Sequence, residues 1–408
     1  TGHQNVYMPM FIPESLLKKE GELISGFAPE CAWVTQGGNN NLEERMAVRP
    51  TSETLFSDYY SSKINSYRDL PKLYNQWCSV VRWEKETRPF LRTREFLWQE
   101  GHTIHETQKE AEEETLRMLN VYKDFFHDYL AIPSVIGFAG AEYTYTNEAL
   151  MYNGVALQCG TSHYFGQKFS KAYNIKFSNR NSQQEYVYQT SWGTTTRMIG
   201  ALIMVHSDEN GLVLPPRIAP RQVVIVPIGA DEEVITLAKS INEKLNSNGV
   251  VSFVDLTEKS PGFKFAEHEV NGIPVRIELG KRDMESGVVT LARRDTRERI
   301  TVDINCDIVK EIKNLLEDIQ TNLYNRALEH RNSLTFEAHN LDEMRNIMNT
   351  QPGFVKAMWC GDEACELKIK EIRGTKSRCI LEHDDPIDDK CVVCGKKAKH
   401  LVLWGIQY

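Results

Sequence analysis

The sequence has no long hydrophobic run. A membrane-spanning helix needs roughly 20 consecutive apolar residues, whereas the longest candidates here, such as residues 223–228, are only strand-sized. Internal repeats and low-complexity tracts are also lacking, and 41% apolar with 25% charged residues is typical of a globular protein. We therefore expect no membrane partner, and for 408 residues we expect two or three domains.

A signal segment is missing from the start of the chain. The sequence opens Thr1-Gly2-His3-Gln4, with neither a Met nor a charged stretch followed by an apolar one. It reads as the inside of a domain, so we expect further residues upstream.

The sequence has no excess of positive charge. Its formal net charge of −8 argues against a general polyanion binder, and we expect no DNA partner. Another nucleic acid is not excluded, because the charge near the contact decides such binding. Residues 82–94 carry five Arg and Lys against two Glu, and residues 276–299 carry seven against five acids. A solvated surface is the alternative interpretation of both stretches.

The nine cysteines do not suggest a disulfide framework, because their number is odd and four of them form two close pairs. These pairs are Cys360-x4-Cys365 and, after 25 intervening residues, Cys391-x2-Cys394. Two such pairs brought together make a closed tetrahedral thiolate site, which is typical of structural Zn²⁺ in a reducing compartment. Residues that could replace one ligand are Cys379, His383 and His400.

The first part of the chain, up to residue 218, has the pattern of an α+β domain. β-Branched and aromatic content predicts strands at residues 6–11, 47–49 and 77–84. A long helix is predicted at residues 107–130, because Leu116, Leu119, Tyr122, Phe126 and Leu130 recur at helical spacing.

The pattern changes after Pro215-Pro216, where strands and helices begin to alternate. A buried strand at 223–227 is followed by Asp231 as a helix N-cap, a helix that ends at Asn248-Gly249, and three further strands. These strands are predicted at residues 250–254, 275–279 and 288–292. We expect a βαβ-type domain with a right-handed crossover, and then a helix near residues 308–324.

The densest chemical signal lies between residues 82 and 98. A strand, a charged loop and a returning strand predict an antiparallel hairpin, with arginines that can reach a polyphosphate from two directions. Arginine suits this task because its planar fork binds phosphate bidentately and keeps its charge. A solvated hairpin is the alternative, but it would rarely carry Trp83, Phe90, Phe96 and Trp98 together.

Several motifs of this chain resemble those of the class II aminoacyl-tRNA synthetases. Arg82-Trp83-Glu84, with Phe96 beyond the loop, is similar to motif 2, and residues 211–217 (GLVLPPR) look like motif 3. Residues 1–13 look like the end of motif 1, without its preceding helix. Three stretches match the prolyl-tRNA synthetases closely: residues 49–53 (RPTSE), 96–102 (FLWQEGH) and 159–163 (CGTSH).

The resemblance to prolyl-tRNA synthetases spans essentially the whole chain and implies three domains. These are a class II catalytic core with an antiparallel sheet flanked by helices at 1–218, an α/β anticodon-binding domain at 219–325 and a zinc-binding α/β C-terminal domain at 326–408. The last is similar to that of the archaeal and eukaryotic-type enzymes. About 60 residues separate Gln99 from Cys159, too few for the editing insertion of the bacterial type.

The implied activity is the activation of L-proline by ATP with Mg²⁺, followed by transfer of the prolyl group to tRNA(Pro). The resemblance also implies a cytoplasmic homodimer. Arg82 would hold the α-phosphate and the proline carboxylate, and Arg217 would reach the γ-phosphate, so that these two arginines are the expected catalytic residues. We expect no general base, because the attacking carboxylate is already ionised.

The resemblance also implies the rest of the substrate sites. Phe96 and Arg217 would cover the two faces of the adenine. The other expected ATP-binding residues are Glu84, Arg92, Thr93, Gln158, Thr161, Thr195 and Arg197. For proline, Thr51 and Glu53 are expected on one strand, where both side chains could accept the N–H groups of the secondary ammonium. Trp98 and His163 would line the pocket of the ring.

The βαβ-type domain resembles the family's anticodon-binding domain. Unstacked bases can be read by charged side chains with aromatic residues nearby, and we expect Lys264, Glu278 and Arg282 to contact the anticodon. Solvated charges are the alternative for these three residues.

Three other functions remain open from the sequence. A threonyl enzyme would need a Cys and two His as zinc ligands in its catalytic domain, and Thr51, Glu53 and Trp98 fit proline better. A catalytically inactive, RNA-binding relative would usually lack Arg82 or Arg217, and both are present. A simple zinc-dependent RNA-binding module leaves the two arginine motifs unexplained.

Overall fold

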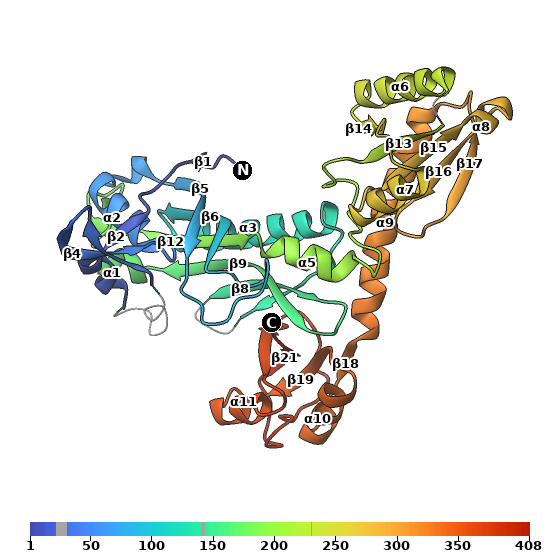
Figure 1. Cartoon of the computed structure of the whole chain (residues 1–408). Helices are drawn as coiled ribbons and strands as arrows, with labels where there is room; N and C mark the ends of the chain where they lie inside the picture. The colour runs from blue at the N-terminus through green and yellow to red at the C-terminus, as the bar shows by residue number, and fades with distance from the viewer. Residues whose placement is uncertain (22–30, 140–142, 230) are drawn as a thin grey trace. The chain divides into compact units, whose positions relative to one another are not determined.

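The computed structural model describes residues 1–21, 31–139, 143–229 and 231–408, which divide into two compact units (Figure 1). The first unit combines residues of the N-terminal half with the C-terminal segment: Thr1–Lys123, Ser134–Ala201 and Thr335–Tyr408. The second unit consists of Asp124–Pro133 and Leu202–Leu334. Within these described ranges no helix is long and apolar enough to cross a membrane.

An eleven-stranded sheet organises the first unit, in the order β1-β5-β6-β12-β9-β8-β7-β20-β21-β19-β18. Neighbouring strands are antiparallel except for the parallel pairs β1/β5 and β18/β19. The strands are β1 (Gln4–Asn5), β5 (Lys72–Val81), β6 (Glu95–His105), β7 (Val135–Phe138), β8 (Thr144–Leu150), β9 (Ala156–Gly166), β12 (Tyr188–Thr195), β18 (Thr335–Glu337), β19 (Phe354–Trp359), β20 (Thr375–Ile380) and β21 (His400–Ile406).

Shorter elements complete the described part of this unit. They are β2 (Phe11–Pro13), β3 (Trp33–Gly37), β4 (Asn40–Val48), β10 (Lys176–Ser178), β11 (Gln184–Tyr186), α1 (Glu14–Gly21), α2 (Glu53–Lys63), η1 (Tyr67–Asp69), α4 (Lys168–Ala172), α10 (Leu341–Thr350) and α11 (Glu363–Lys370). Two helices have residues in both units: α3 (Gln108–Asp128) and α5 (Arg197–His206). The C-terminal segment, expected as a domain of its own, continues the sheet of the catalytic part through the pairing of β20 with β7.

The hairpin predicted around residues 82–94 is present as β5 and β6, but the strand predicted at residues 6–11 is wrong. Residues 6–10 lie between β1 and β2, and only Phe11 belongs to a strand, as the first residue of β2. Pro9 has no N–H to give to a ladder, and the N–H of Met8 donates to Oε1 of Gln76 at 2.9 Å. A side-chain partner therefore replaces the strand neighbour there. The predicted helix at 107–130 is confirmed as α3, although Leu116, expected in its apolar face, is 44% exposed.

The second unit is built around a five-stranded sheet in the order β14-β13-β15-β16-β17. β13 is parallel to β14 and β15, whereas β16 and β17 continue the sheet antiparallel. Its elements are β13 (Val223–Ile228), β14 (Ser252–Val254), β15 (Val275–Gly280), β16 (Val288–Arg293), β17 (Arg299–Asp303), α6 (Glu232–Ser247), α7 (Pro261–Val270), α8 (Lys281–Glu285) and α9 (Ile308–Ser333). The predicted βαβ-type pattern is thus confirmed.

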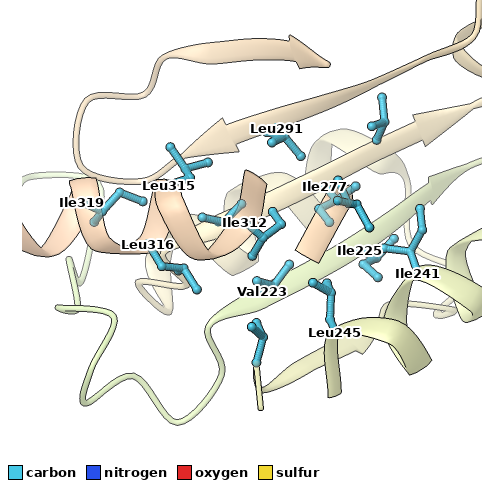
Figure 2. Close-up of a cluster of buried hydrophobic side chains, with 14 of the residues drawn as sticks. Val223, Ile225, Ile241, Leu245, Ile277, Leu291, Ile312, Leu315, Leu316 and Ile319 are labelled. Carbon is cyan, nitrogen blue, oxygen red and sulfur yellow. The ribbon is translucent and has the colours of Figure 1, made fainter. Parts of the chain in front are cut away.

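Both faces of this sheet are covered, which explains the uninterrupted apolar run of β13. Val223 and Ile225 pack into a core with residues of α6 and α9, such as Leu245 and Ile312 (Figure 2). The alternate residues Val224 and Val226 belong to a separate cluster on the other side. A strand buried on both faces needs apolar residues at every position.

The ends of α6 follow from local sequence. The Asp231 side chain accepts a hydrogen bond from the N–H of Glu233 at 3.0 Å, as expected of an N-cap. The helix stops before Asn248, and Gly249 has a φ of +81°, which favours glycine. The next long helix, α9, runs nine residues beyond the predicted end at 324.

Replacing Ile277 by Ala should destabilise the second unit by about 2–5 kcal/mol, since this fully buried side chain would leave a cavity. Val251→Ala is the matched control, because Val251 is 48% exposed and its truncation should stay within about 0.5 kcal/mol. Chemical unfolding measures both. Equal losses for the two variants would contradict the assignment of this core.

Candidate active site

A cavity of about 320 Å³ lies in the first unit and collects the residues singled out by the sequence. Its wall is formed by β6, β9, β12, the loop after β5 and the segment that leads into α2. All thirteen predicted ATP- and proline-binding residues of this unit line the cavity: Thr51, Glu53, Arg82, Glu84, Arg92, Thr93, Phe96, Trp98, Gln158, Thr161, His163, Thr195 and Arg197.

The strand register brings these side chains together. β6 contributes every second residue to the cavity, because alternate side chains of a strand share a face; they are Phe96, Trp98, Glu100 and His102. Across the sheet, His102 pairs with Ser191 of β12, and Ser191 pairs with His163 of β9. One row of the sheet therefore carries side chains from three separate segments.

Two glycines make room on opposite faces of these strands, Gly193 at the cavity and Gly101 on the other face. Gly193 lies between Glu100 and Thr161 in the register, and an added Cβ there would meet only the Gln99 carbonyl, at 3.5 Å. A Cβ on Gly101 would lie 1.9 Å from the ring of Trp192. Glycine at 101 thus lets the indole lie flat against β6.

The segment before α2 is held by a buried arginine. Arg49 is fully buried and donates to the carbonyls of Met8 at 2.7 Å and Ser79 at 2.9 Å. The prediction that Thr51 and Glu53 share a strand is wrong, because β4 ends at Val48 and Glu53 begins α2. The two side chains nevertheless meet, since the Thr51 hydroxyl donates to the Glu53 carboxylate.

A buried carboxylate, that of Glu100, forms part of the lining of the cavity. Glu100 is 2% exposed, and its Oε1 accepts from Ser52 at 2.5 Å and from Gln76 at 2.6 Å. Its Oε2 lies 2.8 Å from Nε2 of His102. Burial alone would raise the pKa of Glu100, but the charge and hydrogen bonds of these partners lower it. Glu100 is therefore an ionised group at neutral pH.

Arg82 directs its guanidinium into the cavity at the end of β5. Its Nε donates to the Pro50 carbonyl at 3.0 Å, and its charged group lies over the rings of Phe96 and Trp98, 5.6 and 5.4 Å from their centroids. Burial lowers the pKa of Arg82, while the negative charge of Glu53 opposes that shift. An arginine remains charged even so.

Arg197 adds a second cationic group to the lining of the cavity. Its Nε donates to the Leu91 carbonyl at 3.0 Å, which ties the start of α5 to the loop of the hairpin. Burial lowers the pKa of this guanidinium, and the positive charges of Arg82 and Arg92 act in the same direction. These three arginines thus create one region of positive potential, and a bound anion would reduce the repulsion among them.

His163 is an uncharged member of the cavity. Its Nδ1 lies 2.8 Å from the Thr144 hydroxyl and its Nε2 lies 3.1 Å from that of Thr161. Burial lowers the pKa of His163 to about 4. The ring is therefore neutral at pH 7, consistent with a lining role and not with a cationic one.

The cavity also contains residues that the sequence did not assign to the substrate sites. They are Phe90, Leu91, Glu100, His102, Thr144, Cys159, Gly160, Ser191, Trp192, Gly193 and Thr194. The alternation Phe96, Trp98, Glu100, His102 was a readable signal, because the first two were already expected in the site. For Thr144 no local signal existed, since only the pairing of β8 with β9 brings it to His163.

The four predicted zinc ligands lie together near the C-terminus. The sulfur atoms of Cys360, Cys365, Cys391 and Cys394 all lie within 4.8 Å of one another. The Sγ of Cys360 is 3.7 Å from that of Cys365 and 3.8 Å from that of Cys394. Zn–S bonds of about 2.3 Å in a tetrahedron separate sulfurs by about 3.8 Å, so the spacing fits Zn²⁺.

Backbone donors favour the thiolate of Cys391, whereas burial raises the pKa of Cys360 and of Cys365. Burial would raise the pKa of Cys391, but the backbone N–H groups of Cys394 and Val393 bring it down to about 7. Within the described ranges, the three alternative ligands lie outside this group of sulfurs: Cys379, His383 and His400.

The three predicted anticodon contacts lie in the second unit and differ in exposure. Lys264 is 5% exposed and donates to the Asp255 carbonyl at 2.9 Å. Glu278 is 6% exposed and accepts from Arg276 and Arg299. Arg282, on α8, is exposed. The contact of all three with tRNA stays a prediction.

Arg217 also belongs to the second unit. Its guanidinium donates to Oε1 of Glu317 at 2.8 Å and to the Asp128 carbonyl at 3.0 Å. Its role toward ATP, as the partner of Arg82, stays a prediction.

The neutral state of His163 has a consequence for stability. In the unfolded chain a histidine has a pKa near 6.5, so between about pH 6.5 and 4 the unfolded state binds a proton that folded His163 does not. The free energy of unfolding therefore falls as the pH drops through this window. Chemical unfolding of His163→Gln at several pH values should show a shallower fall. His383→Gln, at an exposed position, is the control and should follow the parent chain; identical slopes for both variants would contradict the assignment.

Comparison with known proteins agrees with this geometry. Residues 33–206 match the model of the tRNA synthetase class II core domain (G, H, P, S and T), and residues 222–315 match that of the anticodon binding domain. Residues 341–408 match the C-terminal domain of prolyl-tRNA synthetase. The expected combination of a class II core, an anticodon-binding domain and a C-terminal domain is therefore confirmed.

Individual relatives match along the whole chain. A proline–tRNA ligase of Clostridium novyi is 57% identical over 416 aligned positions, which cover 100% of this chain and 87% of that protein. The coverage is the same for the proline–tRNA ligases of Lachnoclostridium phytofermentans, at 59% identity, and Ruminiclostridium cellulolyticum, at 55%. The chain belongs to the proline–tRNA ligase family.

Proposed function

We propose that the cavity of the first unit binds ATP and L-proline together and forms prolyl-adenylate and pyrophosphate, after which the prolyl group passes to the 3′ end of tRNA(Pro). One observation carries this proposal. A single cavity joins a cluster of three arginines, suited to phosphates, with a short polar segment at Thr51 and Glu53, suited to an ammonium group.

The arginines serve the first step, in which the proline carboxylate attacks the α-phosphorus in line and pyrophosphate leaves. Negative charge builds on the phosphoryl oxygens, and fixed cations stabilise it without reorganising during the reaction. Arg82 holds the α-phosphate and the carboxylate, while Arg197 and Arg92 supply charge along the nucleotide. Thr93, Thr195 and Glu84 complete the nucleotide side.

Phe96 and Gln158 orient the nucleotide. The Phe96 ring lies at the cavity end of the hairpin, edge-on to Trp98 with centroids 5.9 Å apart, and offers its face to the adenine. Gln158 and Thr161 lie where the phosphates are held. Mg²⁺, when bound with ATP, neutralises part of the phosphate charge.

Proline is held through its secondary ammonium and its ring. Thr51 and Glu53 accept the two N–H groups, and the ionised Glu100 below adds negative potential. Trp98 and neutral His163 line the ring, which carries no polar group of its own. A larger side chain is excluded by size.

The Cys cluster binds a structural Zn²⁺ through four thiolates. Such a closed site leaves no position for substrate and stabilises the fold of the C-terminal segment. The remaining partners are tRNA(Pro), contacted by the anticodon-binding domain, and a second copy of the chain. Trp77 and Leu97, which are 66% and 62% exposed on neighbouring strands, offer apolar surface for such a homodimer. The enzyme acts in the cytoplasm.

Arg82→Ala should lower proline-dependent ATP–pyrophosphate exchange by about 10²–10³-fold, because about 3–4 kcal/mol of transition-state stabilisation is lost. Arg68→Ala is the matched control, since Arg68 is exposed on η1, outside the cavity, where its guanidinium lies over the ring of Tyr67. It should retain full exchange. Activity with threonine in place of proline, or an unimpaired Arg82→Ala enzyme, would overturn the proposal.

Cys391→Ser should abolish stoichiometric zinc, measured by mass spectrometry of the metal, and should lower the Tm of the holoenzyme. Cys306→Ser lies outside the cluster and should keep one zinc per chain with an unchanged Tm. A parent chain purified without chelators that contains no zinc would refute the metal site.

A further inference from the structure

A buried ion pair joins the C-terminal segment to the catalytic part of the sheet. Arg378 of β20 is 6% exposed and donates through Nε at 2.9 Å and through a terminal nitrogen at 2.7 Å to Oε2 of Glu148 on β8. Glu148 is fully buried. No step of the proposed reaction uses either residue.

The other oxygen of this carboxylate begins a chain of hydrogen bonds that ends at the cavity. Oε1 of Glu148 accepts the hydroxyl of Thr146 at 2.8 Å, and the Thr146 oxygen accepts the side-chain amide of Gln158 at 3.2 Å. A β-bulge skips Cys159 and places Glu148 directly opposite Gln158 on β9. Gln158 lines the cavity.

The hydrogen bonds from Gln158 through Thr146 to Glu148 have a fixed donor-to-acceptor direction, because a hydroxyl has only one proton. When that proton goes to an ionised Glu148, the Thr146 oxygen can only accept from the amide nitrogen of Gln158. The carbonyl oxygen of the Gln158 side chain is then the group left for the cavity. A protonated Glu148 could instead donate to the Thr146 oxygen, and the side-chain amide of Gln158 could then rotate and exchange its oxygen and nitrogen positions.

Arg378 favours the ionised form of this carboxylate, to which it donates two hydrogen bonds. Burial raises the pKa of Glu148 above its ordinary value, and the positive charge of Arg378 is the largest effect that opposes the rise. Arg197, on the cavity side, opposes it to a smaller extent. Glu148 thus lies between a cation of the C-terminal segment and a cation of the candidate active site.

We propose that Arg378 is a positioning residue for ATP binding, which acts through Glu148 and Thr146 to orient the side-chain amide of Gln158. The C-terminal segment thereby contributes to the activation site without touching substrate. This inference rests on the proposed function, because it assigns Gln158 to the nucleotide.

The test compares steady-state constants for ATP and for proline in pyrophosphate exchange by the full chain. Arg378→Met should raise the KM for ATP by about tenfold, the effect expected when one oriented hydrogen bond is lost, and should leave the KM for proline within about twofold. Lys356→Met is the control, because Lys356 forms an exposed ion pair with Asp384 at 2.7 Å in the same segment. It should change neither constant.

A double variant separates positioning from folding. Removing one partner of a buried pair destabilises a protein, whereas replacing both by apolar groups is often neutral. Glu148→Met with Arg378→Met should therefore restore the Tm but keep the high KM for ATP, since Thr146 still lacks its acceptor. Recovery of the KM together with the Tm would overturn the proposal and leave the pair a purely structural role.

The Gln158→Ala variant separates the proposed nucleotide role of Gln158 from the proposed positioning role of Arg378. It should raise the KM for ATP, and adding Arg378→Met should then have little further effect, because both changes act through one group. If Gln158→Ala raises that KM and Arg378→Met adds its full effect, the proposed role of Arg378 is overturned while the role of Gln158 stands. If Gln158→Ala leaves the KM for ATP unchanged, the nucleotide role of Gln158 is wrong, and the proposed role of Arg378 is wrong with it.

Discussion

The antiparallel register of β6, β12 and β9 is the constraint on which the rest of this site depends. It aligns His102, Ser191 and His163 in one row and Glu100, Gly193 and Thr161 in the next. A shift of one residue in either pairing would turn the whole set to the opposite face. The reactive geometry is therefore fixed by backbone hydrogen bonds, and each side chain needs only its ordinary position on a strand.

Charge is the second constraint, because the cavity must hold cations before any substrate arrives. Partly buried guanidinium groups cost free energy unless they are compensated, and both Arg82 and Arg197 have local partners. Arg82 lies over two rings and donates to a carbonyl, while Arg197 donates to the Leu91 carbonyl.

The sequence predicted the lining of the cavity better than it predicted local structure. Motif order identified thirteen lining residues, because chemical constraints retain residue types at fixed spacings. Thr51 and Glu53 were predicted to lie together, although the prediction that they share a strand was wrong. The loop that carries Thr51 is held by Arg49, which donates to backbone carbonyls of distant segments. The strand expected at 6–11 failed for the same reason, because its partner is a side chain of β5.

What the sequence could not reveal depends on contacts between remote segments. No local pattern links Arg378 to Glu148 across 230 positions, and nothing in the spacing of the cysteines indicates that the C-terminal strands extend the central sheet. In the second unit, the charges of Lys264 and Glu278 looked equally suited to tRNA and to solvent. The fold adds that both are buried and bonded within their own domain.

The place of β21 in the sheet has a consequence for synthesis. This strand is the last along the chain, yet it lies inside the sheet, between β20 and β19. Until the ribosome has produced it, both neighbours expose an unpaired edge, which is a template for wrong pairing with other chains. The strands β5, β6, β9 and β12 do not have to wait for it, so this part of the protein is expected to fold in two stages, the second after β21 has been synthesised.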